Sequence, residues 1–370
     1  MIFNSIKNNK KMEEESSPQY SRSDFVSLEE IANRFSISLD ELKKIDSIYP
    51  VRVTRYYFNL IEKKGDAIYK QCIPSIEEID EKLQNVPGVE EDPLHEEPER
   101  QLRKNVPKGI THRYPNRVLF LVSNQCATYC RFCTRKRKVG DPKRPLSEKD
   151  IERGIEYISQ HEEINDVIIS GGDPFMLSKS KLESILDRVY SIINKREGII
   201  RIGTRVPVTY PQRINQELIN MLKKYKPLYI NVHFNHPKEI TEESSKACNL
   251  LVDAGIVLGN QTVLLKGVND DAETLKQLFT KLLYIRVKPY YLYQCDPVKG
   301  INHFRTRVEV LEEIYKKLRG WISGLAIPTP VIDAPGGGGK VPCIPKCYEI
   351  KENIVKLTNY EGKKFFYPQP

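Results

Sequence analysis

The sequence predicts an α/β protein with a parallel sheet, arranged as a doubly wound layer or as a full or partial barrel. Three observations support this fold class. From Arg117 onward, short runs rich in β-branched residues alternate with longer segments of helical period. Such strict alternation indicates parallel strands that are covered by helices. In addition, 39% hydrophobic and 29% charged residues in a chain of 370 are typical of a globular protein that buries a substantial core.

The N-terminal part of the chain has a different pattern. Residues 1–20 are polar, and we expect them to form a disordered tail. Residues 21–108 are predicted to form a helical region and a linker. Ser27 and Ser38 each precede a helical pattern, with Glu30 and Glu41 three positions later, which is typical of a helix N-terminus. Four prolines between positions 85 and 108 then predict an extended linker.

The predicted βα core spans residues 109–325, and a C-terminal segment spans residues 326–370. We expect strands at residues 118–122, 166–170, 199–204, 228–234, 256–263 and 284–293. The helices are expected at residues 148–160, 179–194, 215–224, 241–253, 272–283 and 307–321. Unusual polar residues lie at or after the ends of these strands, or within the fifth one. Because the strands of a βα barrel end on one face, we expect these residues to converge on one site.

Three cysteines follow the first predicted strand. Cys126, Cys130 and Cys133 are separated by four and three positions. An electron-carrying four-iron cluster usually has four thiolates, so three would leave one iron open to bind a substrate or cofactor. Two alternatives remain: the cysteines pack as small apolar side chains, or they form a zinc site that Cys343 or Cys347 completes.

This cysteine spacing, with Phe132 directly before the last cysteine, resembles the cluster motif of the radical S-adenosylmethionine (SAM) enzymes. The resemblance implies a [4Fe-4S] cluster whose open iron binds SAM and, once reduced, cleaves it to a 5′-deoxyadenosyl radical. The stretch Gly171-Gly172-Asp173 resembles the segment that receives the methionyl amino group of SAM. Taken alone, two adjacent glycines more often form a plain turn.

A second motif lies in the C-terminal segment, where four consecutive glycines, residues 336–339, precede Lys340. Such a run lets the backbone approach a bound group closely. A lysine amine can condense with an aldehyde, and pyridoxal 5′-phosphate (PLP) is the common cellular aldehyde used in this way. The alternative is a flexible surface loop with a solvated lysine.

Together these motifs resemble the lysine 2,3-aminomutase family over about residues 50 to 370. Further matching segments lie at residues 112–117, 133–137, 233–237, 289–296 and 303–306. The resemblance implies an isomerase that interconverts L-lysine and L-β-lysine by moving an amino group between adjacent carbons. It also implies a partial barrel of six βα units, with SAM, a [4Fe-4S] cluster and PLP as cofactors.

The family resemblance also implies roles for individual residues. Lys340 would carry PLP, with Arg113 and Arg117 near its phosphate and Tyr293 against its ring. Arg135 would bind the carboxylate of the amino acid, whereas Asp296 and Asp333 would bind its distal ammonium. His233 and Gln261 would contact a cofactor. Each residue has a plainer alternative, such as a solvated charge or a packed core side chain.

Several absences and partners are also expected. Relatives hold a structural zinc through a C-terminal cysteine cluster and a cysteine near the position of Asp271; the chain ends at Pro370, so no such zinc is expected. The net charge of +9 is spread along the chain, which disfavours nucleic-acid binding. The sequence contains no run of about 18 apolar residues, which a membrane-spanning helix would need, and we expect a cytoplasmic protein. Expected partners are an amino acid and a reductant such as flavodoxin or ferredoxin. The oligomeric state stays open, with a homo-oligomer among the options.

Three alternatives remain open for the function. The same chemistry could act on arginine, or its product could be destined for attachment to an elongation factor. A radical SAM enzyme that modifies RNA or protein would explain the basic run at residues 131–138 but would need no PLP at Lys340. An iron–sulfur electron carrier would hold a cluster that does not respond to SAM.

Overall fold

The centre of the molecule is a nine-stranded sheet in which the strands follow one another in chain order. The computed structural model describes residues 20–142 and 145–369. Strands β2 to β8 run parallel, and β1 and β9 are antiparallel at the two edges. The strands are β1 (Ile110–Tyr114), β2 (Arg117–Ser123), β3 (Asp166–Gly171), β4 (Ile199–Gly203), β5 (Leu228–Val232), β6 (Val257–Leu264), β7 (Lys288–Gln294), β8 (Thr329–Ala334) and β9 (Gly339–Pro342).

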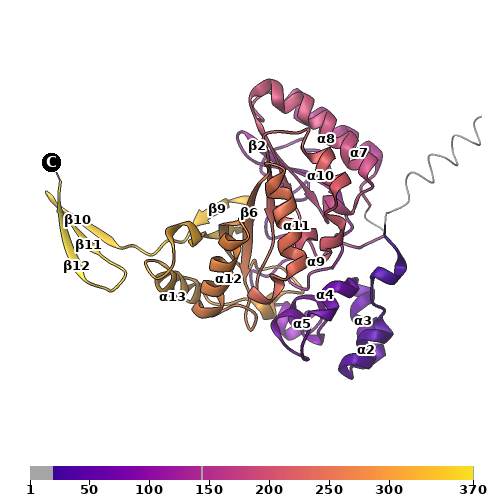
Figure 1. Ribbon diagram of the computed structural model, residues 1–370, viewed down its shortest axis with the longest axis horizontal. Helices are drawn as coiled ribbons and strands as arrows, with labels where there is room; N and C mark the ends of the chain where they lie inside the picture. The colour runs from indigo at the N-terminus through magenta and orange to yellow at the C-terminus, as the bar shows by residue number, and fades with distance from the viewer. Residues whose placement is uncertain (1–19, 143–144, 370) are drawn as a thin grey trace, which may run out of the picture.

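Helices alternate with the parallel strands and cover the outside of the sheet (Figure 1). Each buries one face; α8, for example, buries Leu182, Ile185, Leu186 and Val189, which recur at helical spacing. The helices between the strands are α7 (Glu148–Gln160), α8 (Lys179–Ile193), α9 (Val206–Thr209), α10 (Gln216–Leu222), α11 (Glu242–Asp253), α12 (Ala272–Tyr284) and α13 (Val308–Leu318). The sheet forms a nearly closed, partial (β/α)6-type barrel, which confirms the predicted fold class.

Three features of the sheet differ from the sequence prediction. The edge strand β1, which pairs antiparallel with β2, was not among the predicted strands. The strand expected from residue 284 begins only at Lys288, because Tyr284 ends α12 and Arg286 adopts a left-handed backbone with φ of 62°. The sheet also continues past the six predicted strands. The additional strands β8 and β9 form a hairpin. The glycines of its turn do not indicate a strand, so the sequence did not predict it.

The N-terminal helices pack beside the barrel (Figure 1). They are α2 (Leu28–Phe35), α3 (Leu39–Ile48), α4 (Arg55–Asn59), α5 (Ala67–Cys72) and α6 (Glu81–Gln84). The predicted caps are present: Ser27 and Glu30 form a capping box, and the Ser38 hydroxyl accepts from the Glu41 N–H. The tail predicted for residues 1–20 lies, up to residue 19, outside the described residues.

The segment predicted as a linker is held against the barrel by hydrogen bonds. Between residues 85 and 108 it consists mainly of turns and bends. The Glu90 N–H donates to the Pro297 carbonyl at 3.0 Å. The buried Gln101 amide donates to the Ile110 carbonyl and accepts from the His112 N–H, so it pairs with the edge of β1. This segment therefore forms part of the wall around the barrel mouth.

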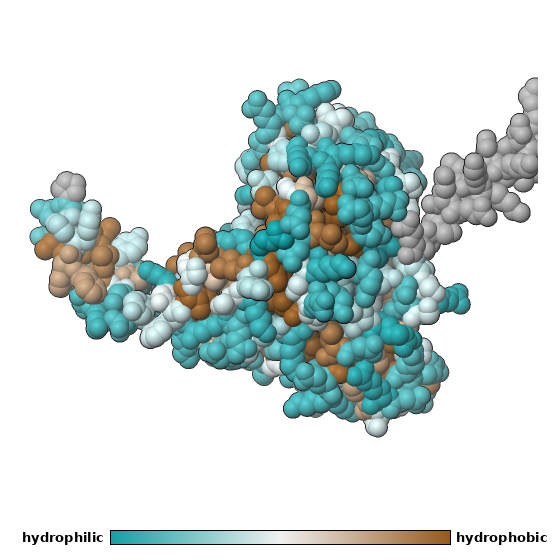
Figure 2. Space-filling model, viewed as in Figure 1, coloured by the Kyte–Doolittle hydropathy of each residue, from teal (hydrophilic) through white to brown (hydrophobic). Residues whose placement is uncertain are grey.

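The C-terminal residues form a separate arm that projects from the body (Figure 1). The arm is a three-stranded antiparallel sheet of β10 (Tyr348–Lys351), β11 (Ile354–Thr358) and β12 (Lys364–Pro368). Apolar side chains are exposed on it, as Figure 2 shows; Ile350, Phe366 and Tyr367 are 61%, 70% and 59% exposed. Within the described ranges, no helix has both the length and the apolar character needed to cross a membrane.

Candidate active site

A cavity of about 440 Å³ lies within the barrel and reaches the carboxyl ends of its strands. Every residue that the sequence analysis singled out for the site lines this cavity. They are Arg113, Arg117, Cys126, Cys130, Phe132, Cys133, Arg135, Gly171, Gly172, Asp173, His233, Gln261, Tyr293, Asp296, Asp333 and Lys340. The topology thus brings together side chains that lie more than 220 positions apart in the sequence, as the convergence of parallel strands predicts.

The three cysteines lie on a loop that directly follows β2. All three are free thiols with partial exposure to the cavity. The loop is tied to the N-terminal region, because the Tyr129 N–H donates to the Arg52 carbonyl and the Arg131 N–H to the Gln71 carbonyl, both at 2.9 Å. Burial, together with nearby thiols, raises the pKa of Cys126 and of Cys133. Buried thiolates of this kind need a nearby positive charge, which a metal centre supplies.

The two glycines after β3 allow that strand to pack on the cysteine loop. A Cβ atom on Gly171 would lie 2.2 Å from the Ser123 carbonyl oxygen, and one on Gly172 would lie 2.4 Å from the Gln125 carbonyl oxygen. Backbone hydrogen bonds join the same segments, with Gly172 N–H donating to Ser123 and Asp173 N–H to Gln125. A close approach of two backbones therefore explains both glycines, beside any contact with a cofactor.

Asp173 is buried and joins the ends of β3 and β4. Its carboxylate accepts from the Thr204 hydroxyl at 2.8 Å and from the N–H groups of Arg205 and Phe175 at 2.7 and 3.0 Å. Burial raises the pKa of Asp173 to about 6, although these hydrogen bonds lower it in part. Its carboxylate thus orders the loops around the cysteines.

The cavity is also lined by Lys340 and Asp333, which are paired across the β8–β9 hairpin. The Lys340 Nζ lies 3.2 Å from Asp333 Oδ2, and Arg113 reaches Asp333 Oδ1 at 3.3 Å. The Lys340 amine also lies 5.5 Å from the centre of the Tyr293 ring. The glycine-rich turn places this lysine, since Gly336, Gly337 and Gly339 all have positive φ.

Beside Lys340, an arginine faces the cavity with unused hydrogen-bonding capacity. The Arg117 guanidinium lies 4.1 Å from the centre of the Tyr114 ring, and the Tyr114 hydroxyl accepts from the Lys340 N–H at 2.8 Å. The buried Arg117 Nε has no hydrogen-bond partner among the described residues. A buried guanidinium N–H without a partner is costly, so this position fits an anion such as a phosphate.

Asp296 adds a second acid near Asp333. It is 8% exposed, and its carboxylate forms no hydrogen bond with any residue that the structure describes. Burial and the neighbouring Asp333 raise the pKa of Asp296 to about 7. Asp333 is paired with Lys340 and Arg113, but Asp296 has no ion-pair partner among the described residues, so the position beside Asp296 favours a cation.

Arg135 lies at the cavity but already has a partner. Its Nε and Nη2 donate to the two carboxylate oxygens of Glu96 at 2.9 and 2.7 Å. Burial alone would raise the pKa of Glu96, yet Arg135 and other cations lower it to about 2. Glu96 comes from the linker segment, and the sequence analysis did not identify it.

Comparisons with known proteins agree with this geometry. The model of the radical SAM superfamily matches residues 120–279, and the Lysine-2,3-aminomutase model matches residues 315–370. An L-lysine 2,3-aminomutase from Methanococcus maripaludis is 47% identical over 92% of this chain and 78% of its own length. The chain belongs to the lysine 2,3-aminomutase family.

Other relatives of this family differ in their named substrates. An L-lysine 2,3-aminomutase from Fusobacterium nucleatum is 48% identical over 86% of this chain and 73% of its own length. A glutamate 2,3-aminomutase from Clostridioides difficile is 43% identical over 87% of this chain and 74% of its own length. Identity at this level establishes an aminomutase, an isomerase, but leaves the substrate to be argued from the site.

Membership in the family of radical SAM aminomutases implies a [4Fe-4S] cluster and SAM. The donor set fits this cofactor pair, because three thiols on one loop line a cavity large enough for a small molecule. Burial raises the pKa of Cys126, so its thiolate would need a nearby positive charge such as a metal ion. Three protein thiolates leave one iron free to bind another ligand. The His233 ring lies 5.4 Å from the Phe132 ring. Burial and Arg205 lower the pKa of His233 to about 3, so its ring is neutral.

Proposed function

We propose that this aminomutase uses PLP and interconverts L-lysine and L-β-lysine. The observation that carries the proposal is the pair of buried acids, Asp296 and Asp333, beside the amine of Lys340 in the cavity that the cysteines also line. PLP, when bound, supplies an aldehyde that attaches to an amino-group nitrogen and a ring that stabilises an adjacent radical.

The residues around Lys340 support a PLP site. The lysine amine is within reach of the cavity, with its side chain 28% exposed. Arg117 offers an unpartnered N–H to a phosphate, and Tyr293 offers a ring face near the amine. Lys340 and Arg113 both pair with Asp333, whereas Asp296 has no ion-pair partner among the described residues. Asp296 therefore leaves a place for a further cation.

The distal ammonium of lysine provides such a cation. It would lie against Asp296 and Asp333, while the α-carboxylate would be held by Arg135, whose guanidinium can form two parallel hydrogen bonds to a carboxylate. For this contact Arg135 must share its N–H groups with Glu96 or exchange partners. These side chains would fix both ends of the amino acid and orient its β-carbon, and a closed mouth would exclude water.

Charge argues against the substrate of the glutamate-acting relative. A glutamate side chain would place a third carboxylate beside two buried ones, and like charges at such distances disfavour binding strongly. Arginine carries a distal cation as lysine does, so the acid pair alone accepts both. The similarity to relatives named L-lysine 2,3-aminomutase supports lysine over arginine.

Anaerobic turnover assays test this proposal. The protein would be reconstituted with iron and sulfide, reduced, and supplied with SAM, PLP and one amino acid at a time. We expect formation of the β-amino acid from lysine, less from arginine and none from glutamate. Equal or faster turnover of glutamate would refute the substrate assignment. Borohydride reduction followed by peptide mapping should place a pyridoxyl label on Lys340; a label elsewhere would refute the PLP site.

A further inference from the structure

A buried arginine contacts one of the three cysteines. Arg205 follows β4, is 8% exposed, and places Nη1 2.7 Å from the sulfur of Cys130. Among the described residues, this sulfur is the only hydrogen-bond partner of Nη1. The sequence analysis gave this residue no role.

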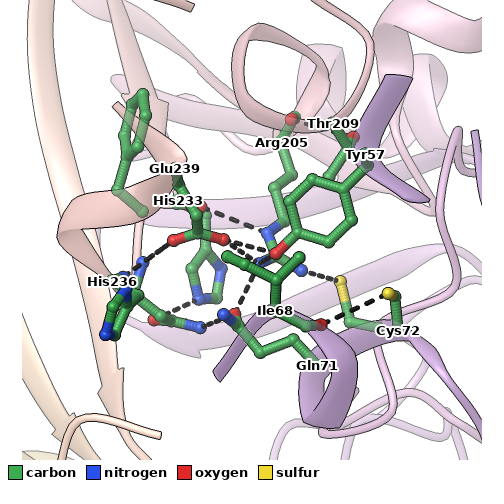
Figure 3. Close-up of polar contacts among 12 residues, drawn as sticks. Tyr57, Ile68, Gln71, Cys72, Arg205, Thr209, His233, His236 and Glu239 are labelled. Carbon is green, nitrogen blue, oxygen red and sulfur yellow. Dashed lines mark hydrogen bonds and ion pairs between the residues drawn. The ribbon is translucent and has the colours of Figure 1, made fainter. Parts of the chain in front are cut away.

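The guanidinium is held rigidly in this position (Figure 3). Its Nη2 donates to Gln71 Oε1, Glu239 Oε1 and Tyr57 Oη at 2.6, 2.7 and 3.0 Å, and its Nε donates to the His233 carbonyl at 3.2 Å. Tyr57 and Gln71 belong to α4 and α5, so the N-terminal helical region completes the arrangement. Arg205 therefore cannot turn away from Cys130 without breaking several buried hydrogen bonds.

The negative charge of Glu239 is shared among many donors. Glu239 is fully buried, and its Oε1 accepts from the Tyr57 hydroxyl as well as from Arg205. Its Oε2 accepts from the N–H groups of Asn235 and His236 at 2.5 and 2.8 Å. Glu239 thus holds Arg205 in position. Because other donors also stabilise the negative charge of Glu239, that charge only partly offsets the positive charge of Arg205 at the sulfur.

Hydrogen bonds and net charge near the sulfurs set the reduction potential of an iron–sulfur cluster. We propose that Arg205 raises the reduction potential of the cluster through its charged hydrogen bond to Cys130, with Glu239 opposing it. In the step concerned, a low-potential one-electron donor, a reduced flavoprotein or iron–sulfur protein, gives one electron to the cluster. No protein bond forms or breaks. The added negative charge is stabilised by the adjacent guanidinium, which makes reduction easier.

This inference rests on the assignment of Cys130 as a cluster ligand. It extends the proposed function because it names residues that control how readily the radical chemistry starts. Neither Arg205 nor Glu239 needs to touch the amino acid for this role. Their effect should appear in the cluster even when no amino acid and no PLP are present.

Redox titration of the reconstituted full chain, followed by electron paramagnetic resonance, tests the inference. At the potential where half of the wild-type cluster is reduced, Arg205→Gln should lower the ratio of reduced to oxidised cluster by at least about tenfold, which corresponds to 59 mV for one electron. Glu239→Gln should raise the same ratio. Arg188→Gln, which removes one positive charge from the exposed surface of α8, should leave it unchanged.

The outcomes separate this inference from the proposed function. An unchanged ratio in Arg205→Gln, or a lowered ratio in Glu239→Gln, would overturn the role of Arg205. If Arg205→Gln fails to assemble a cluster, the sign of the Glu239→Gln shift decides alone. A wild-type protein that assembles no cluster, or a Cys130→Ala protein that keeps it, would instead refute the ligand assignment.

Discussion

The KM for lysine should rise as the pH falls from 8 to 6, because Asp296 must be ionised to bind an ammonium. Burial and Asp333 raise the pKa of Asp296 from 3.8 to about 7. With that pKa, about 90% of Asp296 is ionised at pH 8 and about 10% at pH 6. The binding-competent fraction thus falls about ninefold, and KM should rise by a similar factor. The distal ammonium of lysine stays protonated over this range. The α-amine must lose a proton before it can attach to PLP, and because this contribution is the same in any variant, the part due to Asp296 is the difference between wild type and a variant that cannot ionise there.

Initial rates of β-lysine formation at several lysine concentrations measure this dependence. The matched control is Asp296→Asn, which keeps the size of the side chain but cannot ionise. At pH 8 it should raise KM by about 10- to 150-fold, the equivalent of a charge-assisted hydrogen bond worth about 1.5–3 kcal/mol. Between pH 8 and pH 6 its KM should lack the additional ninefold rise that the protonation of Asp296 causes in the wild type. A wild-type KM that is flat over this range, or an equal slope in the variant, would refute the role given to Asp296.

Four further predictions follow from the site. Asp296→Asn should raise the melting temperature of the ligand-free protein at pH 8. Because the pKa of Asp296 is higher in the folded protein than in the unfolded chain, protonation of this group stabilises the fold. This contribution to stability is complete below about pH 4 and is lost as the pH rises through 7. Scanning fluorimetry at pH 5 and pH 8 should show a larger gain at pH 8; an equal gain at both values would contradict this. Arg117→Gln should weaken PLP binding at least about tenfold in a fluorescence titration, because a phosphate would lose a buried donor, and an unchanged affinity would place the phosphate elsewhere. Cys130→Ala should lose the cluster absorbance and bound iron but keep the borohydride label on Lys340; loss of both would point to misfolding. Arg135→Lys should lower kcat/KM for lysine, since an ammonium cannot replace the bidentate hydrogen bonds of a guanidinium to a carboxylate. An unchanged kcat/KM would assign the binding of the carboxylate to another residue.

Much of the fold was predictable because its elements are regular. The alternation of β-branched runs with amphipathic helices identified β2 to β7, and parallel strands must end on one face. By that rule the sequence alone predicts that the cysteines, Asp173, His233 and Asp296 converge on one site, and all of them line the cavity. The motif around Lys340 was visible because four consecutive glycines are unusual in a folded chain.

The features that sequence reasoning missed depend on contacts between distant segments. Glu96 lies in a proline-rich stretch with no periodicity, and its pairing with Arg135 arises only when that stretch folds along the barrel. Arg205 directly follows Thr204 in a strand-end segment, but its contact with Cys130 depends on support from Tyr57 and Gln71, more than 130 positions earlier. Strands β8 and β9 were missed because Asp333 and Lys340 pair across a turn whose glycines carry no strand signal.

Transfer of an isotope from substrate to cofactor tests the central claim most directly. The claim is that SAM at the three cysteines and an amino acid at Lys340 occupy one cavity within radical reach. L-Lysine carrying deuterium at C3 would be incubated anaerobically with the reduced holoenzyme and SAM, and the nucleoside product analysed by mass spectrometry. The account predicts deuterium in 5′-deoxyadenosine. Formation of 5′-deoxyadenosine without deuterium, while lysine is present at saturating concentration, would contradict it.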